Sequence, residues 1–168
     1  DNMWAVGLGG VVWRWDGLNW LATSSGVNKD LAAIWGTSDG DVWAVGAGGT
    51  IVRWNGAGFA PMASGATSNL TALWGSSATD IWAVGGGGTI LHWNGSEWSD
   101  SSGVTSADLF GIWGTDADNI WVVGRSGTLL RKSGTSWKQV SVGTGTDLFS
   151  VWGTSTSNVW LVGAGGEI

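Results

Sequence analysis

The stretch 70–98, LTALWGSSATDIWAVGGGGTILHWNGSEW, is repeated along the whole chain and decides the fold. Shifted by 39 residues in either direction, it matches the sequence again. One tryptophan column, from the pattern Trp-x-Val-Gly, contains Trp4, Trp43, Trp82, Trp121 and Trp160. A second column, from a Trp-Gly pair, contains Trp35, Trp74, Trp113 and Trp152. A fixed period near 40 residues indicates one supersecondary unit that is copied along the chain.

The composition excludes several classes of protein. The 168 residues include 31 Gly and 16 Trp but no Cys, so disulfides and thiolate metal sites are absent. The net charge is −6 with only seven Lys and Arg, whereas a nucleic-acid surface needs clustered positive charge. No run approaches 18 apolar residues, which argues against insertion into a membrane. We expect neither a nucleic-acid partner nor membrane insertion.

Each repeat predicts four short strands. In one copy they cover 31–36, 42–46, 50–54 and, more weakly, 59–63, and all are rich in Val, Ile, Leu and Trp. No segment shows helical spacing of apolar residues, so we predict an all-β fold with no helix longer than one turn. Asn-Gly or similar pairs separate the third and fourth strands, as in Asn55-Gly56, where tight hairpins are expected.

Further turn residues occupy fixed columns. The column before the second strand, where side chains can bond a turn's backbone, contains Asp41, Asp80, Asn119 and Asn158. The column between the second and third strands, where positive φ is expected, contains Gly49, Gly88, Gly127 and Gly166.

Four-stranded units of this length predict a β-propeller of antiparallel blades with a 39-residue repeat. The strands are apolar at nearly every position, which indicates sheets covered on both faces. We treat 1–168 as a single propeller segment. Its repeat units are approximately 31–69, 70–108 and 109–147, with partial repeats at 1–30 and 148–168. The first strand of each repeat carries a column of small residues and is predicted to be innermost: Ala33, Ala72, Gly111 and Ser150.

The stretch WAVGGGGTILHWNGSEW resembles repeats of the bacterial neuraminidase (Asp-box) superfamily, including those of photosystem II assembly-factor type. It is most similar to Trp-rich propeller repeats in predicted secreted proteins of myxobacteria. The best copy of the box is Asp16-Gly17-x-x-Trp20, and the copies at Asn94 and Ser133 are degraded. In that superfamily the box is a structural hairpin, so the resemblance implies a fold and not an activity.

Catalysis is not expected. Sialidases of the resembled superfamily use a tyrosine nucleophile and an arginine cluster, and this chain has no Tyr. Its arginines outside the linkers share one repeated column with the single histidine, so they cannot converge on one substrate: Arg14, Arg53, His92 and Arg131. The pairs Asp39/Asp41 and Asp116/Asp118 lack the further ligands of a calcium loop and are interpreted as turn residues. We therefore predict no catalytic residue, no metal site and no cofactor.

One acidic column precedes the first strand of each repeat and contains Asp30, Asn69, Asp108 and Asp147. Two interpretations are open: a polar ring at one mouth of the channel, or a turn cap, which we favour. An ion pair between this column and Arg53 or Arg131 is a further hypothesis that spacing alone cannot place.

The tryptophan columns of Trp43 and Trp35 are predicted to be buried and structural. A third column, Trp15, Trp54 and Trp93, is replaced by Lys132 in the fourth repeat. Because a position that accepts lysine is expected to be partly exposed, these rings are candidates for stacking on sugars. Packing between blades is the favoured alternative. The candidate ligand-binding residues are Trp15, Trp54, Trp93, Arg53, His92, Asn55 and Asn94.

Two functions therefore stay open. The first is a non-catalytic module that binds glycans weakly at many sites, at the cell surface or outside the cell. The alternative is a protein–protein interaction or assembly scaffold. The partner is thus a glycan or a protein.

The chain also holds five copies of the second strand but four of each other strand, so a single ring of four blades leaves one strand over. We expect closure by a second chain or, as the favoured alternative, by further repeats of a longer chain.

Overall fold

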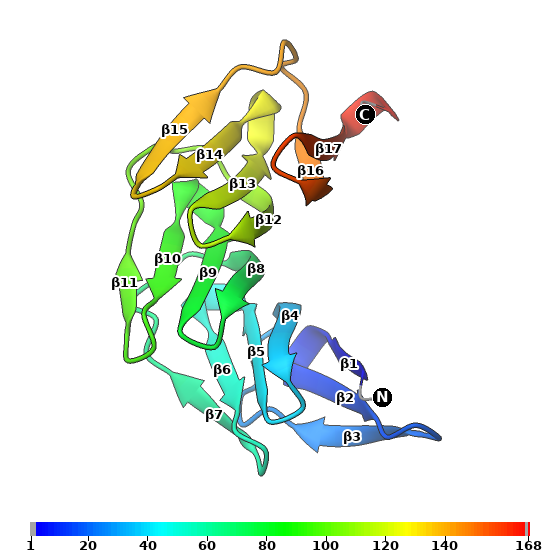
Figure 1. The fold of residues 1–168 in the computed structure, drawn as a ribbon. Coiled ribbons are helices and arrows are strands. Elements are labelled where there is room, and N and C mark those ends of the chain that lie inside the picture. The colour runs from blue at the N-terminus through cyan, green and yellow to red at the C-terminus, as the bar shows by residue number, and fades with distance from the viewer. Residues whose placement is uncertain (1–2, 167) are drawn as a thin grey trace.

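The structure, a computed structural model, describes residues 3–166 and 168 and consists of strands joined by turns (Figure 1). Within those residues every helix is a three-residue 3₁₀ turn, which confirms the predicted all-β fold. None of these helices has the length and apolar character needed to cross a membrane.

The strands of the described chain form five antiparallel sheets. The N-terminal sheet contains β1 (Met3–Val6), β2 (Val11–Trp15) and β3 (Trp20–Ser24). The first complete blade contains β4 (Leu31–Ser38), β5 (Asp41–Gly46), β6 (Ile51–Trp54) and β7 (Phe59–Met62). The second contains β8 (Leu70–Ser77), β9 (Asp80–Gly85), β10 (Ile90–Trp93) and β11 (Trp98–Asp100). The third contains β12 (Leu109–Asp116), β13 (Asn119–Gly124), β14 (Leu129–Ser133) and β15 (Ser136–Val140). The C-terminal sheet contains β16 (Leu148–Ser155) and β17 (Asn158–Gly163).

The sheets stand side by side in an open arc, with the β1–β3 sheet at one end and the β16–β17 sheet at the other (Figure 1). The inner strands, which face the concave side, are β4, β8, β12 and β16, as the small-residue column predicts. Their backbones come close: a Cβ built at Gly111 would lie 3.2 Å from Cα of Ser150. The predicted surplus is also confirmed, since the described chain has five second strands and four inner strands.

A 3₁₀ turn joins the second and third strands of the first four repeats, and a fifth turn follows β17. These turns are η1 (Leu8–Gly10), η2 (Ala47–Gly49), η3 (Gly86–Gly88), η4 (Arg125–Gly127) and η5 (Ala164–Gly166). Their last glycine has positive φ, for example 72° at Gly49, as predicted. The preceding residue is also left-handed, and at Ser126 (φ 55°) it is the one described non-glycine residue with positive φ.

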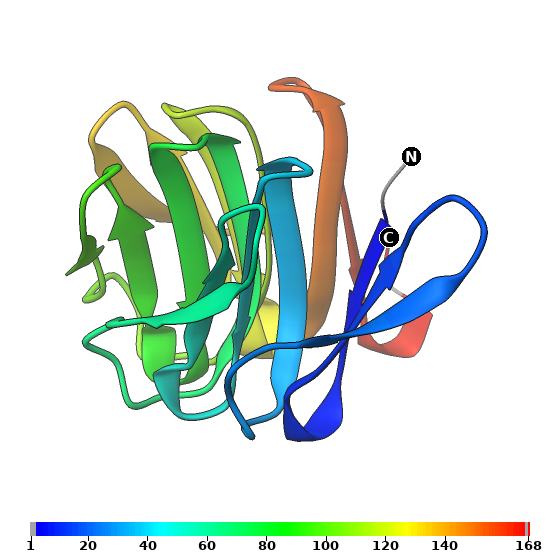
Figure 2. The same ribbon diagram turned by 90° about the horizontal axis from the view of Figure 1, so that it is seen from below.

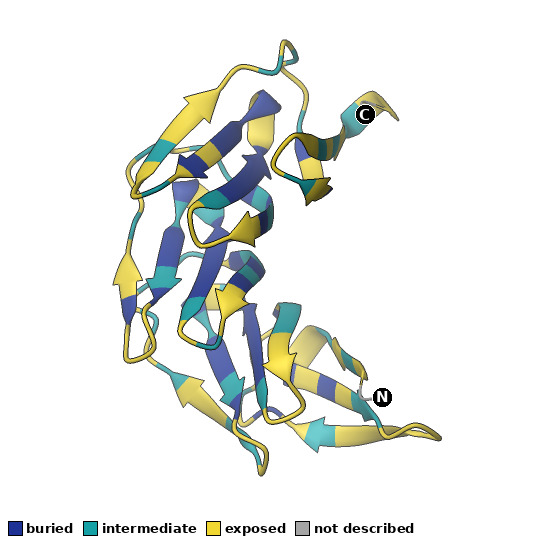
Figure 3. Cartoon of the chain, viewed as in Figure 1, coloured by how far each residue is buried: buried dark blue, intermediate teal, exposed yellow. Residues whose placement is uncertain are grey.

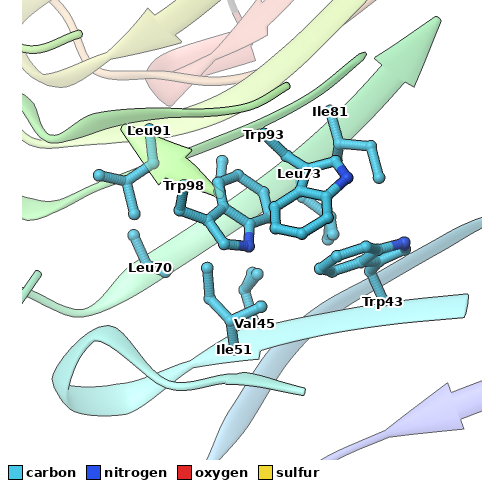
Figure 4. Packing of buried hydrophobic residues seen from close by; sticks show 10 residues of the cluster. Trp43, Val45, Ile51, Leu70, Leu73, Ile81, Leu91, Trp93 and Trp98 are labelled. Atoms are coloured by element: carbon cyan, nitrogen blue, oxygen red, sulfur yellow. The ribbon is translucent and has the colours of Figure 1, made fainter. Parts of the chain in front are cut away.

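The core lies between neighbouring blades, and burial is greatest in the second and third strands of the three complete blades (Figure 3). Trp43 of the first blade is 0% exposed. Its ring centroid lies 5.0 Å from that of Trp93 and 5.7 Å from that of Trp98, both in the second blade (Figure 4). Trp82 and Trp121 are buried as well, which confirms the structural assignment of this column in the complete blades.

The Trp35 column is buried less than predicted. Trp35, Trp74 and Trp113 are half-buried, and Trp152 of the C-terminal sheet is 60% exposed. The expected burial is therefore wrong for Trp152. The physical reason is that each inner-strand tryptophan packs on the following blade, and the described chain has no blade after β16–β17.

Candidate functional site

The acidic column links neighbouring blades. Oδ1 of Asn69, which directly precedes β8, accepts a hydrogen bond of 2.9 Å from the Gly48 N–H in the turn of the preceding blade. Its backbone carbonyl accepts a second bond, of 2.9 Å, from the Gly86 N–H in its own blade. The same side-chain bond recurs from Gly9 to Asp30, from Gly87 to Asp108 and from Ser126 to Asp147. The interpretation as a turn cap is confirmed, and the capped turn belongs to the neighbouring blade.

Arg53 has a different partner from the one hypothesised. Its Nε lies 2.8 Å from Oδ1 of Asp41, at the start of the second strand, instead of pairing with the Asp30 column. The same oxygen accepts a bond from Nε1 of Trp43 at 3.1 Å, and Oδ2 accepts one from Thr37. The guanidinium also lies over the Trp43 ring, 4.7 Å from its centroid. Asp41 was expected to bond a turn backbone; it instead bonds side chains of three strands, β4, β5 and β6.

The second blade builds the same network with histidine. Nε2 of His92 lies 2.7 Å from Oδ1 of Asp80, which also accepts from Nε1 of Trp82. The imidazole is stacked on Trp82 with ring centroids 4.0 Å apart, and 27% of its side chain remains accessible. Ser76 donates to the other oxygen of Asp80. His92 and Arg53 thus play equivalent structural roles.

The third and fourth copies of this network are altered. Asn119 and Asn158 replace the aspartates, and their side-chain amides donate to Asp116 and Thr154 in their own hairpins. Arg131 keeps its place over the Trp121 ring, 5.3 Å from the centroid. The network therefore varies from blade to blade, and its cation–aromatic contact is kept in the third copy, whereas the described chain has no third strand beside Trp160.

Trp54 and Trp93 are buried, so the expectation that they are accessible for stacking is wrong. Nε1 of Trp54 donates to the Asp39 carbonyl, and Nε1 of Trp93 donates to the Ala78 carbonyl. Lys132, in the same column, is only 7% exposed.

Lysine is accepted at this buried position because its ammonium replaces the indole donor. Nζ of Lys132 donates to the Ala117 carbonyl, which is the equivalent of Asp39 and Ala78, and to the Gly134 carbonyl, both at 2.6 Å. Nζ also lies 5.2 Å from the Trp82 ring centroid. Nothing in the sequence indicated that the ammonium of Lys132 could replace the indole N–H of tryptophan as the donor.

The remaining candidates hold hairpins. Oδ1 of Asn55 accepts bonds from the N–H groups of Ala57 and Gly58, and Asn94 does the same in the next blade. Asp16 occupies this position in the N-terminal sheet, where the Asn19 and Leu18 N–H groups lower the pKa of its carboxyl. Trp15 of that sheet is half-buried, with its ring 5.7 Å from that of Trp20. The structure therefore does not gather the candidate residues into one site.

Two features outside the predicted set are available for binding. The first is the inner-hairpin face, formed by the tips 37–40, 76–79, 115–118 and 154–157, which stand at one end of the molecule, opposite the 3₁₀ turns (Figure 2). Most residues of these tips are exposed, including Asp118 with 71% of its side chain accessible. The residues described include no group of three or more His, Cys, Asp or Glu side chains that could hold a metal ion.

The second feature is a cavity of about 320 Å³ between β1 and β4, which we call the Gly36 groove. It is lined by Trp4 of the N-terminal sheet and by 34–39 and Val42 of the first blade. The sequence signal for it is the repeated Trp-Gly pair, which was interpreted only as core.

Comparison with solved structures identifies the fold. The chain matches the structure of YCF48 bound to D1 peptide with a TM-score of 0.74 and 18% identity, over 98% of this chain and 58% of that one. It matches YCF48 from Cyanidioschyzon merolae with a TM-score of 0.74 and 15% identity, over 98% and 64%. For the WD40 β-propeller domain of Doa1 the TM-score is 0.76 with 12% identity, over 96% and 57%. The fold is a β-propeller.

The chain spans less than two thirds of each of these structures, and identities this low show the fold alone. A scan against family models and a search of curated proteins find no match.

Proposed function

We propose that this chain is part of a non-catalytic propeller that recognises protein segments through the inner-hairpin face. The observation that carries the proposal is the match of 98% of the chain to a propeller described with a bound peptide. The likeness itself shows only the fold, so the peptide bound by that protein is not transferred to this chain.

The chemistry of the inner-hairpin face supports a protein ligand. Its tips are TSDG, SSAT, TDAD and TSTS, which offer hydroxyl and carboxylate oxygens and contain no Lys or Arg. Such oxygens accept hydrogen bonds from backbone N–H groups and from Lys or Arg side chains. On the opposite face, the side chains of the Asp30 column are engaged by the 3₁₀ turns. Several tip side chains also bond within their own hairpins, as Asp116 does with Asn119, but the carboxylates of Asp39 and Asp118 accept no hydrogen bond from a described residue. We therefore assign the hairpin face as the contact surface and a peptide with a positive charge as the class of ligand.

Nuclear magnetic resonance titration tests this assignment with two synthetic 15-residue peptides of equal length, one rich in Lys and one in Glu. We expect the Lys-rich peptide to shift amide signals in 37–40 and 115–118, with binding that weakens as salt rises. The double variant Asp39→Asn, Asp118→Asn should weaken it about fivefold or more, whereas Glu97→Gln on an outer hairpin should not. Equal binding of both peptides, or shifts confined to the opposite face, would contradict the proposal.

Glycan binding is the competing function, and the burial of Trp54 and Trp93 removes two of its three predicted stacking sites, whereas Trp15 is half-buried. A glycan array with the same protein provides the comparison. A specific glycan signal without peptide binding would replace the protein-recognition proposal. Location outside the cell stays a prediction.

A further inference from the structure

A third feature is a cavity of about 290 Å³ between the first and second complete blades, which we call the linker pocket. One wall is the linker 64–68, which joins β7 to β8, and the other consists of residues of β10 and β11 together with Thr89 and Ser102. All of its lining residues lie within 64–102, so no part of the pocket belongs to the terminal sheets. Its volume is close to the lower limit for sites that hold small molecules, which is roughly 300 Å³.

The linker pocket combines a buried apolar floor with a polar rim. Leu91 and Trp98, which are 3% and 9% exposed, form the floor. The polar side chains are half-buried or exposed and offer hydroxyl groups and one carboxylate: Ser64, Thr67, Ser68, Thr89, Asp100 and Ser102. None of the described residues that line the pocket is Lys, Arg or His.

The carboxylate reaches the rim because the fourth strand of this blade ends early. β11 ends at Asp100, one residue before the equivalent end of the fourth strand in the other two complete blades. Oδ1 of Asp100 accepts a hydrogen bond of 2.8 Å from the Ser102 N–H, and Oγ of Ser102 accepts one of 2.9 Å from the Ile90 N–H. These bonds turn the chain out of the sheet and hold Asp100 and Ser102 on one side of the pocket.

The floor follows the repeat, whereas the rim does not. An aromatic residue occupies the Trp98 position in all four copies of the fourth strand, as expected for packing between blades. The positions of Asp100 and Ser102 differ in the other complete blades, which have Pro61 and Ala63 in the first and Gln139 and Ser141 in the third. The fold is therefore built without this carboxylate, so Asp100 is available for a function that is specific to one blade.

The polar groups of the rim select the class of ligand. The hydroxyl and then the N–H of Ser102 lower the pKa of the Asp100 carboxyl, so it is a carboxylate at neutral pH. A carboxylate accepts hydrogen bonds, and a serine or threonine hydroxyl both donates and accepts them. An anion would meet this carboxylate with no described Lys or Arg in the lining to bind it. A metal ion would find a single carboxylate among the lining residues, too few oxygen ligands of the right charge.

We propose that the linker pocket binds one pyranose unit of a saccharide. The hydroxyl groups of such a ring bond to Asp100 and to the hydroxyls of the linker, and its apolar face packs on Leu91 and Trp98. The pocket lies beside η3, at the end of the molecule opposite the inner-hairpin face, and it uses none of the rings that the sequence suggested for stacking. The site goes beyond the protein-recognition function and does not depend on it.

Nuclear magnetic resonance titration of the 168-residue chain tests the pocket with the methyl α-pyranosides of glucose, galactose and mannose. We expect at least one of them to shift the amide signals of Thr67, Leu91 and Ser102, with a Kd on the order of 1–10 mM, as is usual for so small a ligand. Sorbitol, a linear polyol without an apolar ring face, should bind at least about tenfold more weakly. Equal binding of sorbitol would reject a pyranose site, and no shift with any of the three sugars at about 50 mM would overturn the proposal.

Two variants locate the sugar. Asp100→Asn keeps an acceptor for the Ser102 N–H but removes the charge, and it should weaken binding by about fivefold or more. Thr67→Val removes a hydroxyl from an exposed residue without changing its shape, and it should weaken binding about threefold. Sugar binding that is unchanged by Asp100→Asn would place the sugar elsewhere and reject this site.

Asp118→Asn is the matched control, because it removes the same charge from an exposed aspartate on the inner-hairpin face. It should leave sugar binding unchanged, and Asp100→Asn should leave binding of the Lys-rich peptide unchanged. The two proposals can therefore fail separately. Loss of sugar binding in both variants to the same extent would show a general effect of charge and contradict a site at the linker pocket.

Discussion

The complete blades and the two terminal sheets have nearly the same sequence at each repeat position but differ in burial. Trp43 is 0% exposed in the first blade, whereas Trp160, at the same position in the C-terminal sheet, is 55% exposed. Gly75 is buried beneath Trp35 of the preceding blade. Gly36 is exposed, and no tryptophan is among the three atoms nearest to a Cβ built there. The difference shows that the repeated tryptophans and glycines specify the interface between two blades and not the interior of one sheet. Such interfaces are the unit of stability in repeat architectures.

The largest expected effect separates these two environments at one repeat position. Trp82→Ala should lower the free energy of unfolding by about 3–5 kcal/mol, because it empties a large aromatic site between blades. Trp160→Ala should change it by less than about 0.5 kcal/mol, as at other exposed positions. Urea denaturation of both variants checks this. Equal losses for the two variants would break the comparison.

A second prediction concerns the lysine inside a complete blade. Lys132→Ala should cost about 2 kcal/mol, since it removes charge-assisted hydrogen bonds to two carbonyls in a buried place. Lys132→Trp should recover much of this loss, because Trp54 and Trp93 make the equivalent bond. Lys138→Ala, on the exposed outer strand, serves as the control in the same denaturation measurement. If Lys132→Ala were as mild as the control, the ammonium would not be replacing the indole donor.

A third prediction tests the link between blades. Asn69→Ala should cost about 1 kcal/mol and speed hydrogen exchange of the Gly48 amide, which loses its acceptor. Asn69→Asp keeps the acceptor, as in the other three repeats, and should be nearly neutral. The terminal equivalent of Gly48 is Gly165, whose N–H no described side chain reaches, so its amide should exchange quickly already in the unaltered protein. Slow exchange at Gly165 would show that the end of the arc is covered.

The fold was predictable because its determinants are local and periodic. Apolar runs bounded by Asn-Gly pairs define the strands, and the 39-residue spacing of Trp43 and Trp82 defines the blades. The candidate site was not predictable in the same way. Exposure was inferred at Lys132 from residue type, but a buried lysine is stable where carbonyls surround its ammonium. The pairing of Arg53 with one particular aspartate and the exposure of Gly36 at one end of the arc both depend on contacts between strands. The spacing of residues in the sequence does not encode these contacts.

The smallest expected effect is a pH dependence that distinguishes the outer hairpin of the N-terminal sheet from those of the first two blades. Asp16 holds the hairpin of the N-terminal sheet, whereas Asn55 and Asn94 hold those of the first two blades. The N–H groups of Asn19 and then Leu18 lower the pKa of Asp16 below its ordinary value of 3.8. Because the pKa of Asp16 is lower in the folded protein than in the unfolded chain, its ionised carboxylate stabilises the fold. This stabilisation is fully present above the unfolded-state pKa and is lost as the pH falls through the folded-state pKa.

Nuclear magnetic resonance titration from pH 6 to pH 2 (roughly the range in which carboxyls protonate) measures this directly. The amide signals of Leu18 and Asn19 should move with a midpoint below 3.8, the ordinary value for an aspartate. Those of Ala57 and Gly58, which bond to an uncharged asparagine, should stay fixed over the same range. Asp16→Asn should abolish the movement and leave the hairpin folded at acid pH, like its counterparts. A midpoint at or above 3.8 would mean that the N–H groups do not stabilise the carboxylate, and the terminal hairpin would then differ from the others in structure as well as in charge.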